Sequence, residues 1–187
     1  MKINKLSLAC VAVLLFLTGC VIPQWKVIEK PELTSAGSSY RVQGPVGWIQ
    51  LTGIEKHTFI TREGPSLQAI EVQQAPMDKA FEGIDIEIND NVLISELAQF
   101  YVADFKAKNQ GLQVSRTDTM PFTIDGKQGF KVTMEFRSEE GLVFDIITCG
   151  LLFGGQFYTL VYHAPRLHYF ERDLPVFNRV VASFEII

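Results

Sequence analysis

The three histidines are the side chains of this sequence best suited to metal binding or proton transfer. His57, His163 and His168 fall on separate predicted elements, and Pro165 lies between the second and the third. Two histidines of one helix bind a metal ion together only when they share a face, and a proline in the spacing breaks the helix. We therefore expect exposed or hydrogen-bonded histidines and no metal site. A site assembled from residues far apart in the sequence stays open.

Other patterns that support catalysis are missing from the sequence. It contains no G-x-S-x-G nucleophile elbow, no phosphate loop and no G-x-G-x-x-G motif. Glu139 and Glu140 fall in a predicted turn, where carboxylates are solvated. The acids between Ile84 and Ile88 lack the spacing of an EF-hand loop, so we interpret them as the solvated face of a strand or loop. The sequence predicts a protein that is not an enzyme, with no catalytic residue and no cofactor.

A site of covalent modification is indicated at the end of the N-terminal apolar run. Lys2 and Lys5 precede apolar residues 6–17, and the chain then becomes polar, which is the pattern of a secretory signal peptide. The run ends in a sequence that resembles a bacterial lipobox, formed by Leu17, Thr18, Gly19 and Cys20. The resemblance implies cleavage before Cys20 and acylation of its sulfur and of the new amino group. The alternatives are an ordinary signal peptide and a membrane-anchor helix, although a spanning helix needs roughly 20 apolar residues.

Cysteine usage agrees with this interpretation. Cys10 lies in the signal peptide and Cys20 is the lipidation site, so Cys149 has no partner for a disulfide. Neither a basic residue nor a helix start lies near Cys149 to lower the pKa of its thiol. We expect a buried thiol, and a redox role is the alternative.

The rest of the chain has the composition of one acidic globular domain. Removing residues 1–19 from the 187-residue chain leaves 168 residues, enough for one domain with a real core. The formal net charge of −4 becomes −6 without the two lysines of the signal peptide. An acidic domain without a basic cluster is a poor ligand for nucleic acid or anionic lipid. We expect no nucleic-acid partner, and membrane attachment through the lipid alone.

The domain organisation follows from these boundaries. We expect a signal peptide at 1–19, a lipidated N-terminus and tether at 20–38, and a folded domain at 39–187. A flexible coil of 19 residues would span roughly 25 Å. Within it, Trp25, Val27 and Ile28 are expected to dock on the domain or to sit in the lipid interface, where tryptophan is favoured.

Periodicity predicts a helix at 92–108 with one apolar stripe, made of Leu93, Leu97, Phe100, Tyr101 and Phe105. Asp90 or Asn91 is expected to cap its start, and Gly111 to close its end. We expect the stripe to pack on a sheet, and a partner-binding face is the alternative.

Strands and a second helix account for the remaining elements. Strands are predicted at 39–42, 48–51, 57–61, 67–72, 112–117, 121–124, 130–137, 142–153 and 156–163. Asp125 and Gly126 predict a tight hairpin. The second helix is expected within 168–183, with Asp173 as its cap and Pro175 in its first turn.

This order of elements resembles the PsbP-like fold and the DcrB-like bacterial lipoproteins that share it. The resemblance covers residues 39–187 and rests on Tyr40-Arg41-Val42 before Pro45 and Gly47-Trp48, Asp125-Gly126 before Gly129-Phe130, and Ser183-Phe184 near the end. It implies an α+β fold in which an antiparallel sheet is packed between helices as an α/β/α sandwich. It also implies a non-enzymatic accessory role in a membrane-associated assembly. No motif matches the metal-binding histidines of some members.

Two functional hypotheses remain. The first is a lipid-anchored, non-catalytic cell-envelope protein that binds another envelope protein or helps assemble a complex, and it predicts an exposed apolar patch. The second is a periplasmic lipoprotein that binds a small apolar molecule, and it predicts an enclosed pocket of ~300 Å3 or more. In Gram-negative bacteria an aspartate after the lipidated cysteine tends to retain a lipoprotein at the inner membrane. Because Val21 stands there, we expect the periplasmic face of the outer membrane, or the outside of the plasma membrane in a Gram-positive cell.

Overall fold

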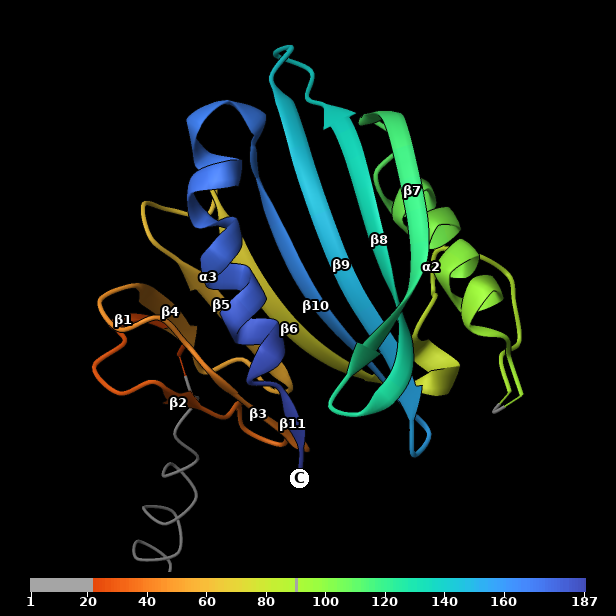
Figure 1. The fold of residues 1–187 in the computed structure, drawn as a ribbon, viewed down its shortest axis with the longest axis horizontal. Helices are drawn as coiled ribbons and strands as arrows, with labels where there is room; N and C mark the ends of the chain where they lie inside the picture. Colours follow the sequence, from red (N-terminus) through yellow and green to blue (C-terminus); the bar gives the residue numbers. More distant parts are fainter. Residues whose placement is uncertain (1–21, 90) are drawn as a thin grey trace, which may run out of the picture.

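The computed structural model describes residues 22–89 and 91–187. Eight strands form one antiparallel sheet: β1 (Gln24–Val27), β4 (Ile49–Thr52), β5 (His57–Thr61), β6 (Ala69–Pro76), β7 (Gln113–Ile124), β8 (Lys127–Arg137), β9 (Val143–Phe153) and β10 (Gln156–Pro165). Their order across the sheet is β1-β4-β5-β6-β10-β9-β8-β7 (Figure 1). A second, small sheet in the order β11-β3-β2 is made of β2 (Glu32–Leu33), β3 (Tyr40–Gln43) and β11 (Glu185–Ile186).

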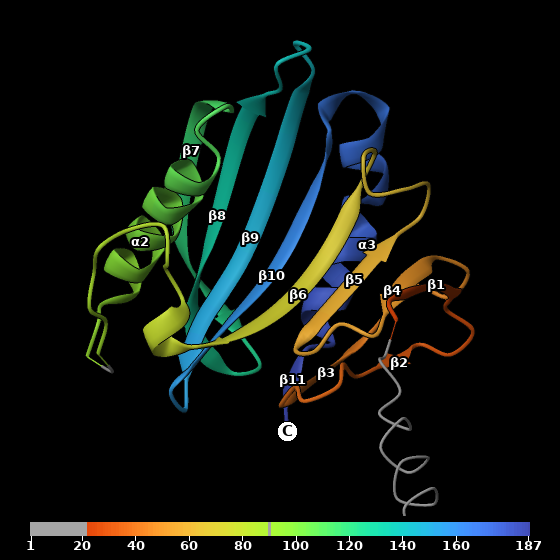
Figure 2. The same cartoon turned by 180° about the vertical axis from the view of Figure 1, so that it is seen from behind.

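Two helices lie on opposite faces of the large sheet, α2 (Ile94–Lys108) on one and α3 (Glu171–Ala182) on the other (Figures 1 and 2). A short turn of 3-10 helix, η1 (Met77–Lys79), precedes α2. A turn, η2 (Arg166–Phe170), leads into α3, and its backbone is not helical at Leu167 and His168. This arrangement confirms the predicted α+β fold with an antiparallel sheet between helices. In the part of the chain that the structure describes, no helix has the length and apolar character needed to cross a membrane.

Tight turns set the register of the long strands. Asp125 and Gly126 have φ angles of 49° and 68° and join β7 to β8, which confirms the predicted hairpin. Positive φ at both central residues defines a type I′ turn, whose twist matches that of the flanking strands. Gly154 and Gly155, with φ angles of 59° and 71°, join β9 to β10 in the same way. The register then decides which side chains face α2 and which face α3.

The sheet face under α3 carries the larger core. Tyr162 of β10 stacks on Phe177 of α3 with ring centroids 5.6 Å apart, and both side chains are buried. Tyr40 of β3 is also fully buried and donates its hydroxyl to the Val72 carbonyl at 2.8 Å. Cys149 belongs to this core and is 2% exposed, which confirms the predicted burial. Burial raises the pKa of the Cys149 thiol to about 12, so the thiol stays protonated and unreactive at neutral pH.

The N-terminal segment contributes Ile28 and Leu33 to this core, whereas the side chains of β1 are exposed, so of the three residues expected to dock or to lie in lipid only Ile28 is buried in the domain. The prediction of a flexible coil at 20–38 is wrong for the residues that the structure describes, because β1 pairs with β4, and Ile28 and Leu33 are 3% and 8% exposed. Gly44 permits this packing, since a Cβ atom there would lie 2.4 Å from Leu33 Cδ1. Folding therefore buries apolar side chains whose release into a coil would cost free energy.

Helix α2 packs on the far end of the opposite face. Its Leu97 is fully buried, and the rings of Tyr101 and Phe105 lie 5.7 and 6.3 Å from those of Phe130 and Phe136 on β8. The predicted stripe therefore packs on the sheet. Leu93 is the exception at 62% exposure, because it is the N-terminal cap residue.

The two expected caps of this helix differ in the structure. The Glu96 carboxylate accepts a hydrogen bond from the Leu93 N–H at 3.1 Å, so a side chain of the first turn caps the start of the helix. The predicted cap Asn91 does not do so, and the alternative, Asp90, lies outside the described residues. The helix ends at Asn109, whose side-chain amide donates to the Phe105 carbonyl at 2.7 Å, and Gly111 does not have a positive φ. Residues 84–88 form a loop, one of the two forms expected for them, and their isoleucines pack against the core under α2.

Helix α3 begins three residues before the predicted start. Pro175 lies inside the helix and removes a backbone bond to the carbonyl of Glu171, an exposed residue where water can replace that bond. Asp173 is not the cap. Its side chain is 1% exposed and accepts hydrogen bonds from Arg62 at 3.2 Å, from Arg172 and from the Gln68 amide at 3.3 Å. This buried carboxylate holds α3 against the loop between β5 and β6.

Substitution of Asp173 by Asn should lower the free energy of unfolding by about 3 kcal/mol. The change removes the buried countercharge of the Arg62 guanidinium, whereas Arg172 keeps its ion pair with Glu63 at 3.1 Å. Breaking a buried pair on one side costs about 3–5 kcal/mol. We expect the lower end because the Arg62 side chain is 46% exposed. Asp118→Asn is the matched control, since the Arg116–Asp118 pair is well exposed and should contribute less than about 0.5 kcal/mol. Equal losses in urea titrations of the two variants would contradict this role for Asp173.

Candidate functional site

The sheet face that carries α2 is covered at one end only. Helix α2 packs on β7 and β8, whereas β10, β6 and β5 are seen directly in Figure 2, with α3 behind them. Alternation along each strand places Glu71 and Gln73 of β6, and Val161 and His163 of β10, on this half-covered face. Their neighbours Ile70, Val72, Leu160 and Tyr162 point into the core under α3.

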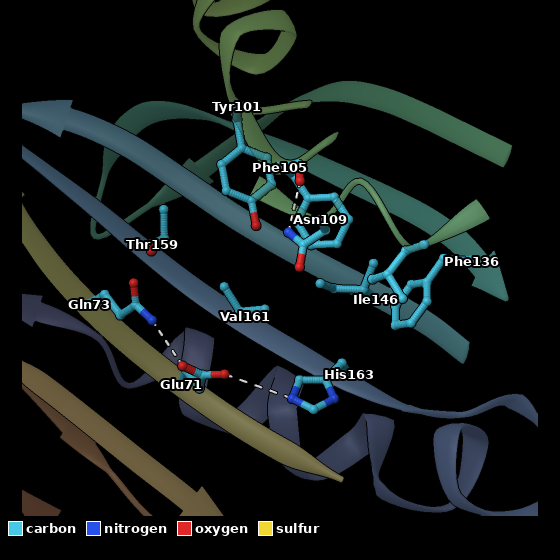
Figure 3. Close-up of a pocket in the computed structure, with 11 residues that line it drawn as sticks. Glu71, Gln73, Tyr101, Phe105, Asn109, Phe136, Ile146, Thr159, Val161 and His163 are labelled. Carbon is cyan, nitrogen blue, oxygen red and sulfur yellow. Dashed lines mark hydrogen bonds and ion pairs between the residues drawn. The ribbon is translucent and has the colours of Figure 1, made fainter. Parts of the chain in front are cut away.

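A groove lies between this open half of the sheet and α2. Its main hollow has a volume of about 330 Å3 and is open along one side. The lining comes from β6, β8, β9, β10, α2 and the residues after α2: Glu71, Gln73, Tyr101, Phe105, Asn109, Leu112, Phe136, Ile146, Thr159, Val161 and His163 (Figure 3). A second hollow of about 190 Å3 shares Gln73, Tyr101 and Asn109 with the first and reaches Lys108. We call these two adjoining hollows the α2 groove.

Glu71 is the charged centre of the groove floor. Its carboxylate lies 3.0 Å from His57 Nε2 on β5 and 3.8 Å from His163 Nε2 on β10. The Gln73 amide donates to the same carboxylate at 2.9 Å (Figure 3). The three strands that carry these residues are neighbours in the sheet, which is why side chains remote in sequence meet here. The Glu71 side chain is 18% exposed, so the cluster can be reached from the groove.

The environment of this cluster separates the protonation states of its members. Burial raises the pKa of Glu71, but the hydrogen bond from His57 and the attraction of His57 and His163 outweigh it, so the net pKa is lowered. Burial lowers the pKa of His163, and the Glu71 charge opposes this only in part. At neutral pH the groove therefore holds an ionised carboxylate beside a neutral imidazole.

The helix supplies the opposite wall. The hydroxyls of Tyr101 and Thr148 of β9 are hydrogen-bonded at 2.7 Å, which fixes the Tyr101 ring at the edge of the groove. Burial raises the pKa of Tyr101, and the Glu71 charge raises it further, so its hydroxyl stays protonated. Asn109 closes the groove at the end of α2, where its side chain is held by the Phe105 carbonyl.

This chemistry suits binding. Among the hydrogen bonds of the described residues, none joins the ring of His57 or His163 to a hydroxyl or thiol that it would activate. Nor do residues 22–89 and 91–187 bring three His, Cys, Asp or Glu side chains into a group that could hold a metal ion. The groove instead offers apolar contact from Phe105 and Val161 with a few polar groups to orient an occupant, the usual composition of a binding site.

The structure brings together only part of what the sequence suggested. His57 and His163 share Glu71 and are hydrogen-bonded or paired as expected, while His168 lies on the exposed turn before α3. Sequence analysis missed Glu71, although a carboxylate inside the apolar run of β6 was a signal for it. The predicted lipidation site, Leu17, Thr18, Gly19 and Cys20, lies outside the described residues.

Comparison with known proteins supports the fold. No protein-family model matches the chain, and no curated protein matches it in sequence. Among solved structures, cyanobacterial PsbP (CyanoP) from Synechocystis sp. PCC 6803 has a TM-score of 0.54 at 12% identity and covers 91% of this chain and 95% of its own. A mutant of protein Mog1 has a TM-score of 0.52 at 13% identity over 84% and 96% of the two chains.

A third similar structure is a protein from Bacteroides thetaiotaomicron VPI-5482, with a TM-score of 0.52 at 11% identity. It covers 85% of this chain and 49% of its own. At these identities the likeness concerns the fold. The chain has a PsbP-like and Mog1-like fold, which confirms the fold implied by the sequence resemblance.

The protonation of His163 predicts how stability depends on pH. Folding lowers the pKa of His163, so the unfolded chain binds this proton more tightly and acid favours unfolding. The loss begins near the unfolded value of about 6.5 and is complete below the lowered folded value. Glu71 does not interfere, because its stabilising charge is lost only as pH falls from its ordinary pKa of 4.5 through its lowered folded value, below the measured range. His163→Gln should therefore lose less unfolding free energy than the wild type between pH 7.5 and pH 5.5.

His168→Asn is the control for this measurement. His168 is exposed, and its φ of 72° and ψ of −47° are those of a strained γ-turn, so any strain that the substitution changes is the same at every pH. Its urea unfolding should follow the wild-type pH profile. A His163→Gln profile as steep as that of the wild type would show that His163 does not set the dependence.

Proposed function

We propose that this protein is a lipid-anchored, non-catalytic cell-envelope protein that binds another envelope protein through the α2 groove. The half-covered sheet face carries this proposal, because it leaves an open groove with apolar walls around Glu71. The two hollows follow one another along β6 and β10, from Ala75 and Phe157 to Glu71 and His163, and an extended segment of a partner fits such a run.

The lipobox supports the envelope part of the proposal. The signal peptide is residues 1–19, and Cys20 carries the acyl chains, two or more of which hold a protein stably on a membrane. Val21 in place of aspartate supports the periplasmic face of the outer membrane. Because residues 24–38 pack on the sheet, the folded domain starts almost at the lipid and not at residue 39.

A small apolar ligand is the second candidate occupant. The 330 Å3 of the main hollow lies within the range of small-molecule sites, and Glu71, Tyr101 and Asn109 would orient such a ligand. The open side argues for the protein partner, since ligand sites of this kind enclose most of the ligand surface.

Cys20→Ala should abolish acylation. Growth with labelled palmitate should mark the wild-type chain and place it in the membrane fraction, whereas the variant should carry no label. Cys149→Ala is the matched control, because this buried thiol is not the modified one and its labelling should equal that of the wild type. Equal labelling of the Cys20→Ala chain would refute the lipid anchor.

A photo-crosslinking amino acid at position 73 should capture one discrete envelope protein in intact cells. Gln73 is exposed and lines the groove. The control is the same amino acid at position 167, where Leu167 is 83% exposed on the turn before α3, and it should capture nothing specific. Val161→Trp fills the groove floor and should weaken the crosslink about tenfold or more, equivalent to about 1.4 kcal/mol. Thermal melting checks that the variant folds.

Native mass spectrometry separates the two candidate occupants. Suppose that a small molecule is found on the wild type and lost from Val161→Trp, while no protein is crosslinked. That result would favour the small ligand over the protein partner as the occupant of the groove. If neither a protein crosslink nor a bound small molecule is found, both assignments of the groove are contradicted.

A further inference from the structure

Exposed apolar side chains gather on the segment that follows Cys20. Ile22, Trp25 and Val27 are 70%, 47% and 62% exposed. Val46, 61% exposed, lies in the turn whose Gly47 N–H donates to the Ile28 carbonyl at the end of β1. Four of the ten large exposed apolar side chains thus lie on β1 and its flanks, while the other six are spread over the rest of the described chain. We call Ile22, Trp25, Val27 and Val46 the β1 patch.

The backbone prevents the β1 patch from moving away from the lipid. Ile22 follows Cys20 by two positions, and an extended chain gains at most ~3.6 Å per residue, so their Cα atoms lie within about 7 Å. Trp25 lies within about 18 Å by the same limit. The headgroup layer of a bilayer is itself roughly 5–8 Å deep on each side. Pairing of β1 with β4 then ties the domain to this position.

The chemistry of the β1 patch suits a lipid surface. Trp25 and Val27 alternate with Gln24 and Lys26, so both apolar side chains lie on one side of the strand. Tryptophan is the residue most favoured at the boundary between headgroups and acyl chains. The nearby charges Lys26, Lys30, Glu29 and Glu32 balance one another. The surface is therefore apolar and carries no net charge towards anionic lipid.

We propose that the β1 patch inserts into the interface of the membrane that holds the lipid anchor, so that the domain lies with its β1 edge on the bilayer. This inference rests on the proposed acylation of Cys20. It assigns Trp25 to the lipid interface, and it fixes the face that the domain turns to the membrane.

Tryptophan fluorescence tests the insertion. Trp25 and Trp48 are the two tryptophans of the chain, and Trp48 is buried at 7% exposure. The lipidated protein is placed in phosphatidylcholine vesicles with and without dibrominated acyl chains, whose bromine quenches only nearby tryptophan. We expect the wild type to lose about half of its emission and Trp25→Phe to lose almost none.

A matched pair of variants tests the patch as a surface. Val27→Gln should reduce the quenching of Trp25 at least twofold, because it replaces an apolar contact next to the tryptophan. Leu167→Gln changes an equally exposed apolar residue away from β1 and should leave the quenching unchanged. Equal emission of the lipidated wild type in both kinds of vesicle would overturn the proposal.

The result for insertion can be separated from the result for acylation. If mass spectrometry finds no lipid on Cys20, the chain cut before Cys20 is coupled through that thiol to maleimide lipid in the same vesicles. Cys149 does not compete, because it is buried and its pKa is raised to about 12. Quenching of Trp25 in the coupled protein supports the insertion of the patch, and its absence overturns it.

Discussion

The structure depends on covering a wide sheet with only two helices. Eight strands at ~4.8 Å spacing make a sheet about 34 Å wide, whereas a helix with its side chains is about 10 Å across. One helix therefore covers two or three strands. Under α3 the remaining width is covered by the N-terminal segment and the small sheet, with Ile28, Leu33, Tyr40 and Trp48 in the same core. On the other face, residues 77–93 extend the cover of α2 only slightly, and β6 and β10 stay open.

The two faces consequently have different roles. Under α3, the buried Asp173 carboxylate is paired with two arginines and the Gln68 amide, while the Gln68 side-chain oxygen is buried without a hydrogen-bond partner among the described residues. On the open half, Glu71 keeps contact with solvent and is held by the imidazoles of His57 and His163 and by the Gln73 amide. The face under α3 is closed over its core, and the open half of the other face leaves polar groups in contact with solvent.

Local patterns in the sequence predicted the elements well. Alternation identified β8, Asp125-Gly126 identified the hairpin, and the apolar environment of Cys149 identified its burial. The Glu71 cluster could not be predicted, because it requires β6 to pair with β10 across the whole α2 and β7–β9 insertion. The N-terminal segment was misjudged for a similar reason. Its prolines and glycine are typical of a linker, and only the space left by Gly44 shows that Leu33 packs there.

The absence of a long tether gives the groove a fixed height. The distance from β1 to β6 is three strand spacings, or about 14 Å. A flexible leader before β1 would let the height of the groove above the membrane vary. With the β1 edge on the bilayer, the domain diffuses in two dimensions and carries Glu71 in a thin layer parallel to the membrane. Partners tethered at a similar height meet it at a raised effective concentration, and partners held farther from the surface do not. In the proposed orientation, the strand order of the sheet would thus select partners by their distance from the lipid.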